Sequence, residues 1–173
     1  MNMGGLVAWK IWHYTGGKMD NINRGTARAV ADTAGGYILA TLEVAAPTDR
    51  VFRALASNDI VDWWVRPGVF DTREWKGELS VGSHWEAAGM ARGQQYTLEG
   101  EFLEIEAPRK LSHTWRLVGA PGPQTTVTYL LDEVAGGTRV TLRHSGFPAG
   151  ESSINTCIGW ETSLARLGEY LAR

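Results

Sequence analysis

Cysteine is almost absent from this 173-residue chain, and the single residue, Cys157, excludes an internal disulfide. The cysteine and the four histidines show no metal-ligand spacing, so the sequence predicts neither a metal centre nor another cofactor. No run of about 18 apolar residues is present, which argues against insertion into a membrane. A chain with one cysteine and no such run is expected in the reduced cytoplasm.

An excess of charge of one sign is also missing, because the sequence contains 17 Lys and Arg residues and 19 Asp and Glu residues. No basic run interleaved with aromatic residues is present, so nucleic acid is not an expected partner. The phosphate loop, the dinucleotide fingerprint, Gly-x-Ser-x-Gly and His-Glu-x-x-His are all absent. The sequence therefore gives no motif for nucleotide binding, serine hydrolysis or zinc proteolysis.

Tryptophan, in contrast, is abundant, with eight residues against four Phe and five Tyr. A buried tryptophan brings a large apolar surface and an N–H group that needs a partner. Hydrophobic residues make up 43% of the chain and charged residues 21%, as in an ordinary globular domain. The length predicts a single domain with a substantial core.

The first 36 residues differ from the rest, because glycine pairs interrupt them and no periodic pattern persists. We expect an irregular or loosely docked N-terminal arm over residues 1–36 and one ligand-binding domain over residues 37–173. The arm carries four large apolar side chains in one short stretch: Trp9, Ile11, Trp12 and Tyr14. These side chains either stay loose or contact the domain, a partner protein or a second copy in a homodimer.

From Tyr37 onward, β-rich segments alternate with Gly- and Pro-rich turns. This pattern predicts seven antiparallel strands: Tyr37–Val44, Val69–Trp75, His84–Met90, Gln95–Glu106, Lys110–Val118, Thr125–Val134 and Thr138–His144. Two short helices, one after Pro47 and one over Ile60–Trp64, separate the first two strands. Apolar residues at three- and four-residue steps predict a long C-terminal helix over Glu151–Leu171.

An antiparallel sheet with one apolar face needs a cover, and the C-terminal helix can supply it. A strongly curved sheet cannot touch a straight helix along its whole length. We therefore expect an α+β fold in which sheet and helix enclose a hydrophobic cavity, lined by inward-pointing strand side chains.

Turn lengths predict which residues face each other on neighbouring strands. The last hairpin sets Tyr129 opposite Leu142 and Val127 opposite His144, and the hairpin before it sets His113 beside Tyr129. The two histidines then lie two strands apart and one row out of step. A separation of roughly 10 Å or more is too large for a shared metal ion.

The same alignment predicts the neighbours of Trp115, which lies beside Val127 and opposite Gly100, where glycine leaves room for the indole. Phe102 lies opposite His113, and the apolar phase changes after Phe102, which indicates a β-bulge. The predicted inner face is apolar and aromatic with two histidines: Leu98, Phe102, Leu111, His113, Trp115, Val127, Tyr129, Leu131, Val140, Leu142 and His144.

Few side chains are candidates for chemistry, and each has a plain structural alternative. His113 and His144 are weak catalytic candidates or polar ligand contacts, or else core histidines satisfied by a hydrogen bond. Glu161 either faces the cavity or reaches water at its rim. Trp63 and Trp64 either plug the core or form a lip at the cavity mouth. The predicted ligand pocket comprises Trp63, Trp64, Leu98, Phe102, His113, Trp115, Val127, Tyr129, Leu142, His144, Cys157, Trp160, Glu161 and Leu164.

Several segments together resemble the SRPBCC superfamily, which includes START-like and birch-pollen-allergen-like proteins. They are ATLEVAAPTDRVFRALAS (Ala40–Ser57), Trp63-Trp64, LEGEFLEIEAPRKLSHTW (Leu98–Trp115), TRVTLRHSGF (Thr138–Phe147) and GWETSLARLGEYL (Gly159–Leu171). Within it, the chain resembles the branch of homologues of the activator of the heat-shock-protein-ninety ATPase, over about residues 37–173. The resemblance implies a helix-grip fold with a hydrophobic pocket.

Three functions are open at this point. The first is binding of a small hydrophobic or aromatic molecule, with His113, Tyr129 and Glu161 as polar anchors. The second is a cyclase- or hydrolase-like enzyme in which a pocket histidine, His113 or His144, moves protons; the resemblance implies that a few superfamily members are cyclases or aromatase-like enzymes. The third is a co-chaperone-like or self-association module that uses the N-terminal arm or the exposed tryptophan pair.

Overall fold

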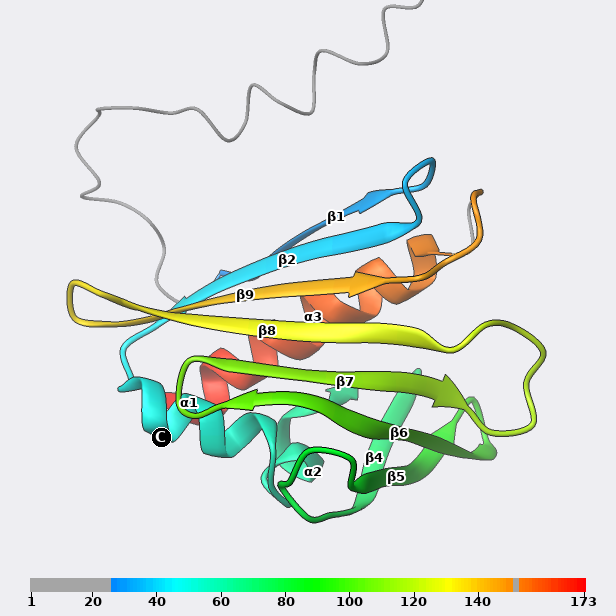
Figure 1. Ribbon diagram of the computed structural model, residues 1–173, viewed down its shortest axis with the longest axis horizontal. Coiled ribbons are helices and arrows are strands. Elements are labelled where there is room, and N and C mark those ends of the chain that lie inside the picture. The colour runs from blue at the N-terminus through cyan, green and yellow to red at the C-terminus, as the bar shows by residue number, and fades with distance from the viewer. Residues whose placement is uncertain (1–25, 151–152) are drawn as a thin grey trace, which may run out of the picture.

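One antiparallel sheet, built from nine described strands, wraps around the C-terminal helix (Figure 1). The computed structural model describes residues 26–150 and 153–173. The elements are β1 (Arg28–Asp32), β2 (Tyr37–Val44), α1 (Thr48–Leu55), α2 (Ile60–Trp63), β3 (Val65–Arg66), β4 (Phe70–Gly77), β5 (His84–Ala91), β6 (Gln94–Glu106), β7 (Lys110–Leu117), β8 (Thr125–Val134), β9 (Gly137–Ser145) and α3 (Ile154–Leu171).

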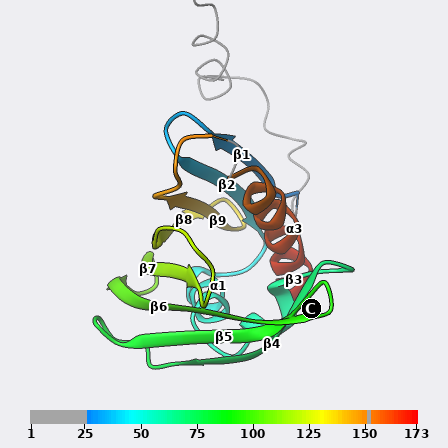
Figure 2. The ribbon, with the colours of Figure 1, turned by 90° about the vertical axis from the view of Figure 1, so that its right-hand side faces the viewer.

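The strand order is β1-β2-β9-β8-β7-β6-β5-β4-β3, so only β2–β9 joins strands distant in sequence. The sheet curls, and α3 lies across its open side between the β1–β2 end and the β3–β4 end (Figure 2). This arrangement confirms the predicted α+β helix-grip fold. The strand count is nine rather than seven, because β1 and the two-residue β3 extend the sheet at its edges.

Strand β1 lies within the segment that was expected to be irregular through residue 36. It pairs with β2 from Arg28 to Asp32, and the Asp32 carboxylate accepts the backbone N–H groups of Ala34 and Gly35 in the connecting turn. Burial alternates weakly along this edge strand, and Val30 is 57% exposed, so the sequence pattern for a strand is faint. The tryptophans of the predicted arm lie outside the described residues.

The predicted register is correct in the two hairpins that have short turns. Val127 pairs with His144 across β8–β9, and Phe102 pairs with His113 across β6–β7. The predicted bulge is also present, since the β6–β7 register shifts between Phe102 and Glu104. Short turns fix the pairing of the strands that they connect.

The predicted β7–β8 register is wrong by two residues. His113 pairs with Val127 instead of Tyr129, and Trp115 pairs with Thr125 instead of Val127. The long connection after β7 does not fix the alignment of the strands, as a tight turn would. A shift of two preserves the side-chain faces, so the predicted inner face keeps its orientation, with His113 and His144 now in one row.

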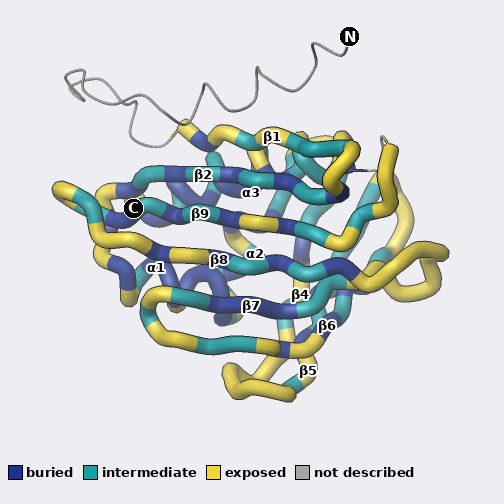
Figure 3. The backbone as a smooth tube through the Cα atoms, turned by 45° about the horizontal axis from the view of Figure 1, so that its top comes forward, coloured by how far each residue is buried: buried dark blue, intermediate teal, exposed yellow. Residues whose placement is uncertain are grey.

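The core lies between the inner face of the sheet and one face of α3. Buried and more exposed residues alternate along the strands, and the buried face of α3 turns toward the sheet (Figure 3). Fully buried side chains from both layers include Ile38, Leu42, Leu111, Val127, Val140, Leu142, Leu164 and Leu167. Each contributes about 1.5–3 kcal/mol from burial. Among the described residues, no helix is long and apolar enough to cross a membrane.

Candidate functional site

A chain of aromatic rings crosses the interior between the sheet and α3. Trp64 is at its centre, with ring centroids 6.3 Å from Trp63, 6.3 Å from Trp85 and 5.8 Å from Trp160. Trp160 also meets Tyr129 edge-on at 6.2 Å. These rings fill the middle of the space in which one continuous cavity was expected, and they divide it into a closed void and an open cleft.

Hydrogen bonds to the backbone hold the tryptophan pair in place. The Trp63 Nε1–H donates to the Ala54 carbonyl oxygen at 2.8 Å, which ties α2 to α1. The Thr72 hydroxyl on β4 donates to the Trp64 carbonyl oxygen at 2.7 Å. Trp63 is 1% exposed and Trp64 is 8% exposed, so both are core residues rather than an exposed lip.

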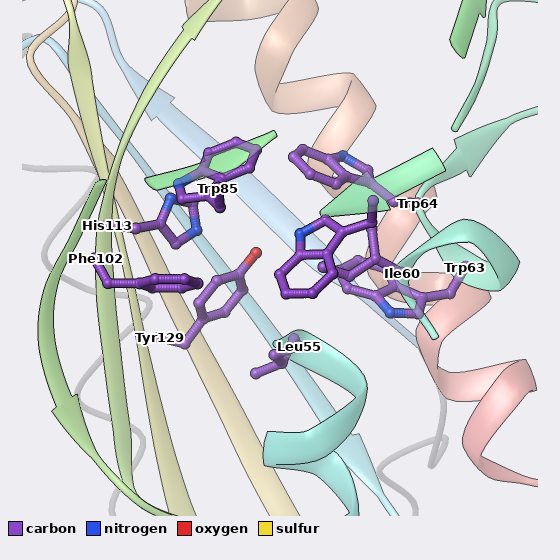
Figure 4. Close-up of a pocket in the computed structure, with 9 residues that line it drawn as sticks. Leu55, Ile60, Trp63, Trp64, Trp85, Phe102, His113 and Tyr129 are labelled. Atoms are coloured by element: carbon purple, nitrogen blue, oxygen red, sulfur yellow. The ribbon is translucent and has the colours of Figure 1, made fainter. Parts of the chain in front are cut away.

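The closed void has a volume of about 10 Å³, which suits about one water molecule. Its sheet side is aromatic, and the Tyr129 hydroxyl points into the space between the sheet and the α1–α2 side (Figure 4). The lining residues are Leu55, Ile60, Trp63, Trp64, Trp75, Trp85, Phe102, His113 and Tyr129. This void is too small for an organic ligand.

The open cleft is larger, at about 300 Å³, and lies at the N-terminal end of α3. This volume is at the lower end of the ~300–1,000 Å³ range of ligand sites. The cleft is lined by Trp64, Arg66, Val69, Phe70, Ala91, Arg92, Tyr96, Leu98, Trp115, Leu117, Asn155, Thr156, Gly159 and Trp160. Trp64 lines both spaces, and its indole is the wall between them.

The structure distributes the predicted pocket residues among different environments. Trp64, Leu98, Trp115 and Trp160 line the open cleft. Trp63, Phe102, His113 and Tyr129 line the closed void. Four others are fully buried core side chains: Val127, Leu142, His144 and Leu164. The remaining two, Cys157 and Glu161, line neither space: Cys157 is partly buried, and Glu161 contacts the edge strand β1.

Glu161 was expected either to face the cavity or to reach water at its rim, and it is not among the residues that line the cleft. Its side chain is exposed, and Oε2 accepts the backbone N–H of Ala29 on β1 at 3.0 Å. Cys157, one helical turn before it, is half-buried, and burial together with the Glu161 charge raises the pKa of its thiol. A raised pKa disfavours the reactive thiolate. The contact with Ala29 was not predicted, because the sequence pattern did not reveal β1, the strand toward which this side of α3 is turned.

His144 is held in a chain of hydrogen bonds that uses both ring nitrogens. The Trp160 Nε1–H donates to Nδ1 at 2.9 Å, which assigns the ring proton to Nε2. Nε2–H then donates to the Thr125 hydroxyl at 2.7 Å, and this hydroxyl donates to the Trp115 carbonyl oxygen at 3.0 Å. Burial, together with a smaller contribution from the neighbouring His113, lowers the pKa of His144 to about 3. The imidazole is therefore a neutral structural group.

His113 is also buried and neutral. Its Nδ1–H donates to the Thr114 carbonyl oxygen at 2.9 Å, and burial lowers the pKa to about 4. Its ring packs edge-on against Trp85 with centroids 4.9 Å apart, on the side of the closed void. Neither histidine lines the open cleft, and the described residues include no group of three side chains suited to hold a metal ion.

Trp85 is the main lining residue absent from the predicted pocket, because the turn lengths used there did not fix the face on which its side chain lies. It is 2% exposed, and its Nε1–H donates to the Thr114 carbonyl oxygen at 3.2 Å. Trp85 pairs with Gly100, where an added Cβ would overlap both the Thr114 carbonyl oxygen and the Trp85 indole. Glycine thus makes room for Trp85 rather than for Trp115. Extending the register from the tight Arg92-Gly93 turn would have revealed this pairing.

The curled sheet, the helix that it grips and the apolar cleft between them together define a helix-grip protein of the SRPBCC type. Residues 45–172 match the family described as Activator of Hsp90 ATPase homolog 1-like protein, and the chain belongs to this family. Membership confirms the resemblance seen in the sequence. No curated protein matches the chain.

Solved structures with the same fold come from several bacteria. Protein CV1439 from Chromobacterium violaceum is 23% identical with a TM-score of 0.72, over 80% of this chain and 98% of that protein. Protein Ms6760 from Mycobacterium smegmatis is 19% identical with a TM-score of 0.73, over 84% and 96% respectively. CalU16 from Micromonospora echinospora is 25% identical with a TM-score of 0.58, over 84% and 83%. These similarities establish the fold.

Proposed function

We propose that the protein binds a small hydrophobic or aromatic molecule in the cleft at the N-terminal end of α3. The observation that carries the proposal is the cleft of about 300 Å³ with a mostly apolar and aromatic lining. Its inner wall is preformed, because Trp64 and Trp160 are buried and stacked on each other. A preformed wall reduces the ordering cost that a ligand would otherwise have to offset.

Binding is favoured over catalysis by the composition of the cleft. Its described lining contains no histidine, cysteine, aspartate or glutamate, the residues that most often act as general base or nucleophile. The Tyr96 hydroxyl is engaged with the Asp71 carbonyl oxygen at 3.1 Å, and burial raises its pKa. His113 and His144, the histidines considered for an enzyme, do not line the cleft, and both imidazoles are neutral.

The neutral fluorescent probe N-phenyl-1-naphthylamine tests the proposal. With 17 non-hydrogen atoms and roughly 0.4–0.5 kcal/mol per atom, we expect a Kd of about 1–10 μM. The fluorescence increase should saturate at one probe per chain. Absence of saturable binding would refute the proposal, and native mass spectrometry of the purified protein would then search for a different occupant.

Two neighbouring residues offer a matched pair of variants. Leu117 lines the cleft and is 38% exposed, whereas Val118 is 47% exposed and does not line it. Leu117→Asn should weaken probe binding several-fold, because a polar amide replaces apolar surface in the cleft. Val118→Asn should leave the affinity unchanged. Equal effects of the two substitutions would place the probe outside the cleft.

A further inference from the structure

The described lining residues give the mouth of the cleft positive charge and no negative charge. Arg66 lies at the end of β3 and Arg92 in the β5–β6 turn, and no Asp or Glu is among the described lining residues. Three other arginines, Arg73, Arg116 and Arg139, each form an ion pair with a carboxylate. No described carboxylate pairs with Arg66 or Arg92, so within the described part of the chain both guanidinium groups are left to an external anion.

Arg92 occupies this place at a conformational cost. Its φ is 49°, the only positive φ of a non-glycine residue in the described part of the chain. Together with Gly93 it forms the two-residue turn that joins Ala91 to Gln94, a position where Asn, Asp or Gly is preferred. Left-handed backbone is unfavourable for an ordinary residue, because Cβ approaches the following carbonyl oxygen. Backbone strain of this kind concentrates at functional sites. In this protein the strained residue, Arg92, lies at the rim of the proposed ligand site.

The N-terminal end of α3 adds further hydrogen-bond donors. Asn155 and Thr156 in the first turn line the cleft, and the Ser153 side chain forms no capping hydrogen bond. The first-turn N–H groups of a helix lack intrahelical acceptors and mark the positive end of its dipole. Trp115 Nε1–H, in another lining residue, is buried and without a partner.

We infer that the ligand is an amphipathic organic acid. Its apolar body lies against Trp64, Leu98 and Trp160, and its carboxylate lies at the mouth between Arg66 and Arg92. This inference rests on the proposed binding function and specifies the chemistry of the ligand. Two guanidinium groups that no described carboxylate pairs with complement one oxyanion, whereas a neutral ligand of the same size would leave them unused.

Displacement of N-phenyl-1-naphthylamine by decanoate and by 1-decanol tests the inference, because these molecules share an alkyl chain and differ in charge. We expect decanoate to bind about tenfold more tightly than decanol in the wild-type protein. Increasing salt should reduce this preference, because the arginines are at the solvent-accessible rim. Equal affinities for decanoate and decanol would overturn the inference and leave the proposed apolar cleft intact.

Variants of the two arginines then test whether these residues cause the preference for decanoate over decanol. Arg66→Gln and Arg92→Asn should each weaken decanoate binding about five- to tenfold and leave decanol binding unchanged. Asparagine accepts a positive φ, so the second variant keeps the turn. Arg66→Lys should retain most of the preference, since it keeps the charge.

Arg109→Gln is the charge-matched control. Arg109 is exposed in the turn before β7, while the cleft residue Leu117 ends that strand. The control should leave both affinities unchanged, and a loss of decanoate binding equal to that of the rim variants would overturn the assignment. Failure of decanoate to displace a bound probe would also refute the inference. Failure of the neutral probe itself to bind would refute the proposed function as well.

Discussion

Replacing Gly159 with leucine should close the cleft and stabilise the protein at the same time. Gly159 lies within α3 and lines the cleft. Apart from its chain neighbours and the nearby backbone of α3 itself, no atom lies within 4 Å of the position that a Cβ would take there. A larger side chain at this position therefore extends into the space that a ligand needs. The substitution separates the role of the cleft from the stability of the fold, because the two are expected to change in opposite directions.

The size of the stabilisation follows from helix propensity. Glycine in a helix interior costs about 1 kcal/mol relative to alanine, and leucine is nearly as favourable as alanine. For a chain of 150–250 residues, 1 kcal/mol raises Tm by about 2–4 °C. We therefore expect Gly159→Leu and Gly159→Ala to raise Tm by about this amount, measured by circular dichroism.

The effect on binding should distinguish the two variants. The cleft of about 300 Å³ has little volume to spare, and the four carbons of leucine would occupy part of it. We expect the Kd of N-phenyl-1-naphthylamine to rise at least tenfold in Gly159→Leu and less than threefold in Gly159→Ala, on a scale where tenfold is about 1.4 kcal/mol.

Either half of this prediction can fail. A lower Tm for Gly159→Leu would mean that the space beside this face of α3 is not open. Unchanged probe affinity in a stable Gly159→Leu protein would mean that the probe binds elsewhere.

Three further predictions concern the groups around the cleft. The folded-state pKa values of His113 and His144, about 4 and about 3, lie below the usual value near 6.5, so between these limits only the unfolded chain takes up protons. The free energy of unfolding should therefore fall by up to about 4 kcal/mol from pH 7 to pH 5, and a constant urea midpoint over this range would contradict the burial of both rings. Trp160→Phe removes the donor to His144 Nδ1 and should cost about 1–3 kcal/mol in urea unfolding, whereas no loss would mean that this hydrogen bond is not formed. Glu161→Ala should speed amide exchange at Ala29 about three- to tenfold, while Glu161→Gln, which keeps an acceptor oxygen, should not; equal rates in both variants would argue against the contact between α3 and β1.

The fold and the inner face of the sheet were predictable because they depend on patterns that survive in a single sequence. Alternation within strands and the apolar stripe of the C-terminal helix are periodic, and each predicts a face. The β8–β9 register followed from a short turn. The β7–β8 register did not, because the connection over residues 118–124 does not constrain which residues pair.

The shape of the cavity was less predictable than its location. The sequence predicted aromatic residues between the sheet and the C-terminal helix. The volume of the cavity, however, depends on the rotamers of these side chains, which the sequence pattern does not give. Trp64 illustrates this, because its place at the end of the second short helix was foreseen, and it directly follows α2, while its stacking on Trp160 across the interior was not. Arg92 escaped attention for a different reason, since a turn signal predicts backbone conformation and not the role of the side chain that it presents.

The indole of Trp64 consequently limits how deeply a ligand that enters from the mouth can reach. A ligand whose head group stays at the arginines can be only as long as the path from the rim to this ring. A relative with a small side chain at the position of Trp64 would join the cleft to the void beyond, where the Tyr129 hydroxyl would meet the far end of a longer molecule. For the proposed ligand, the size of the residue at position 64 thereby sets the greatest length of the apolar body.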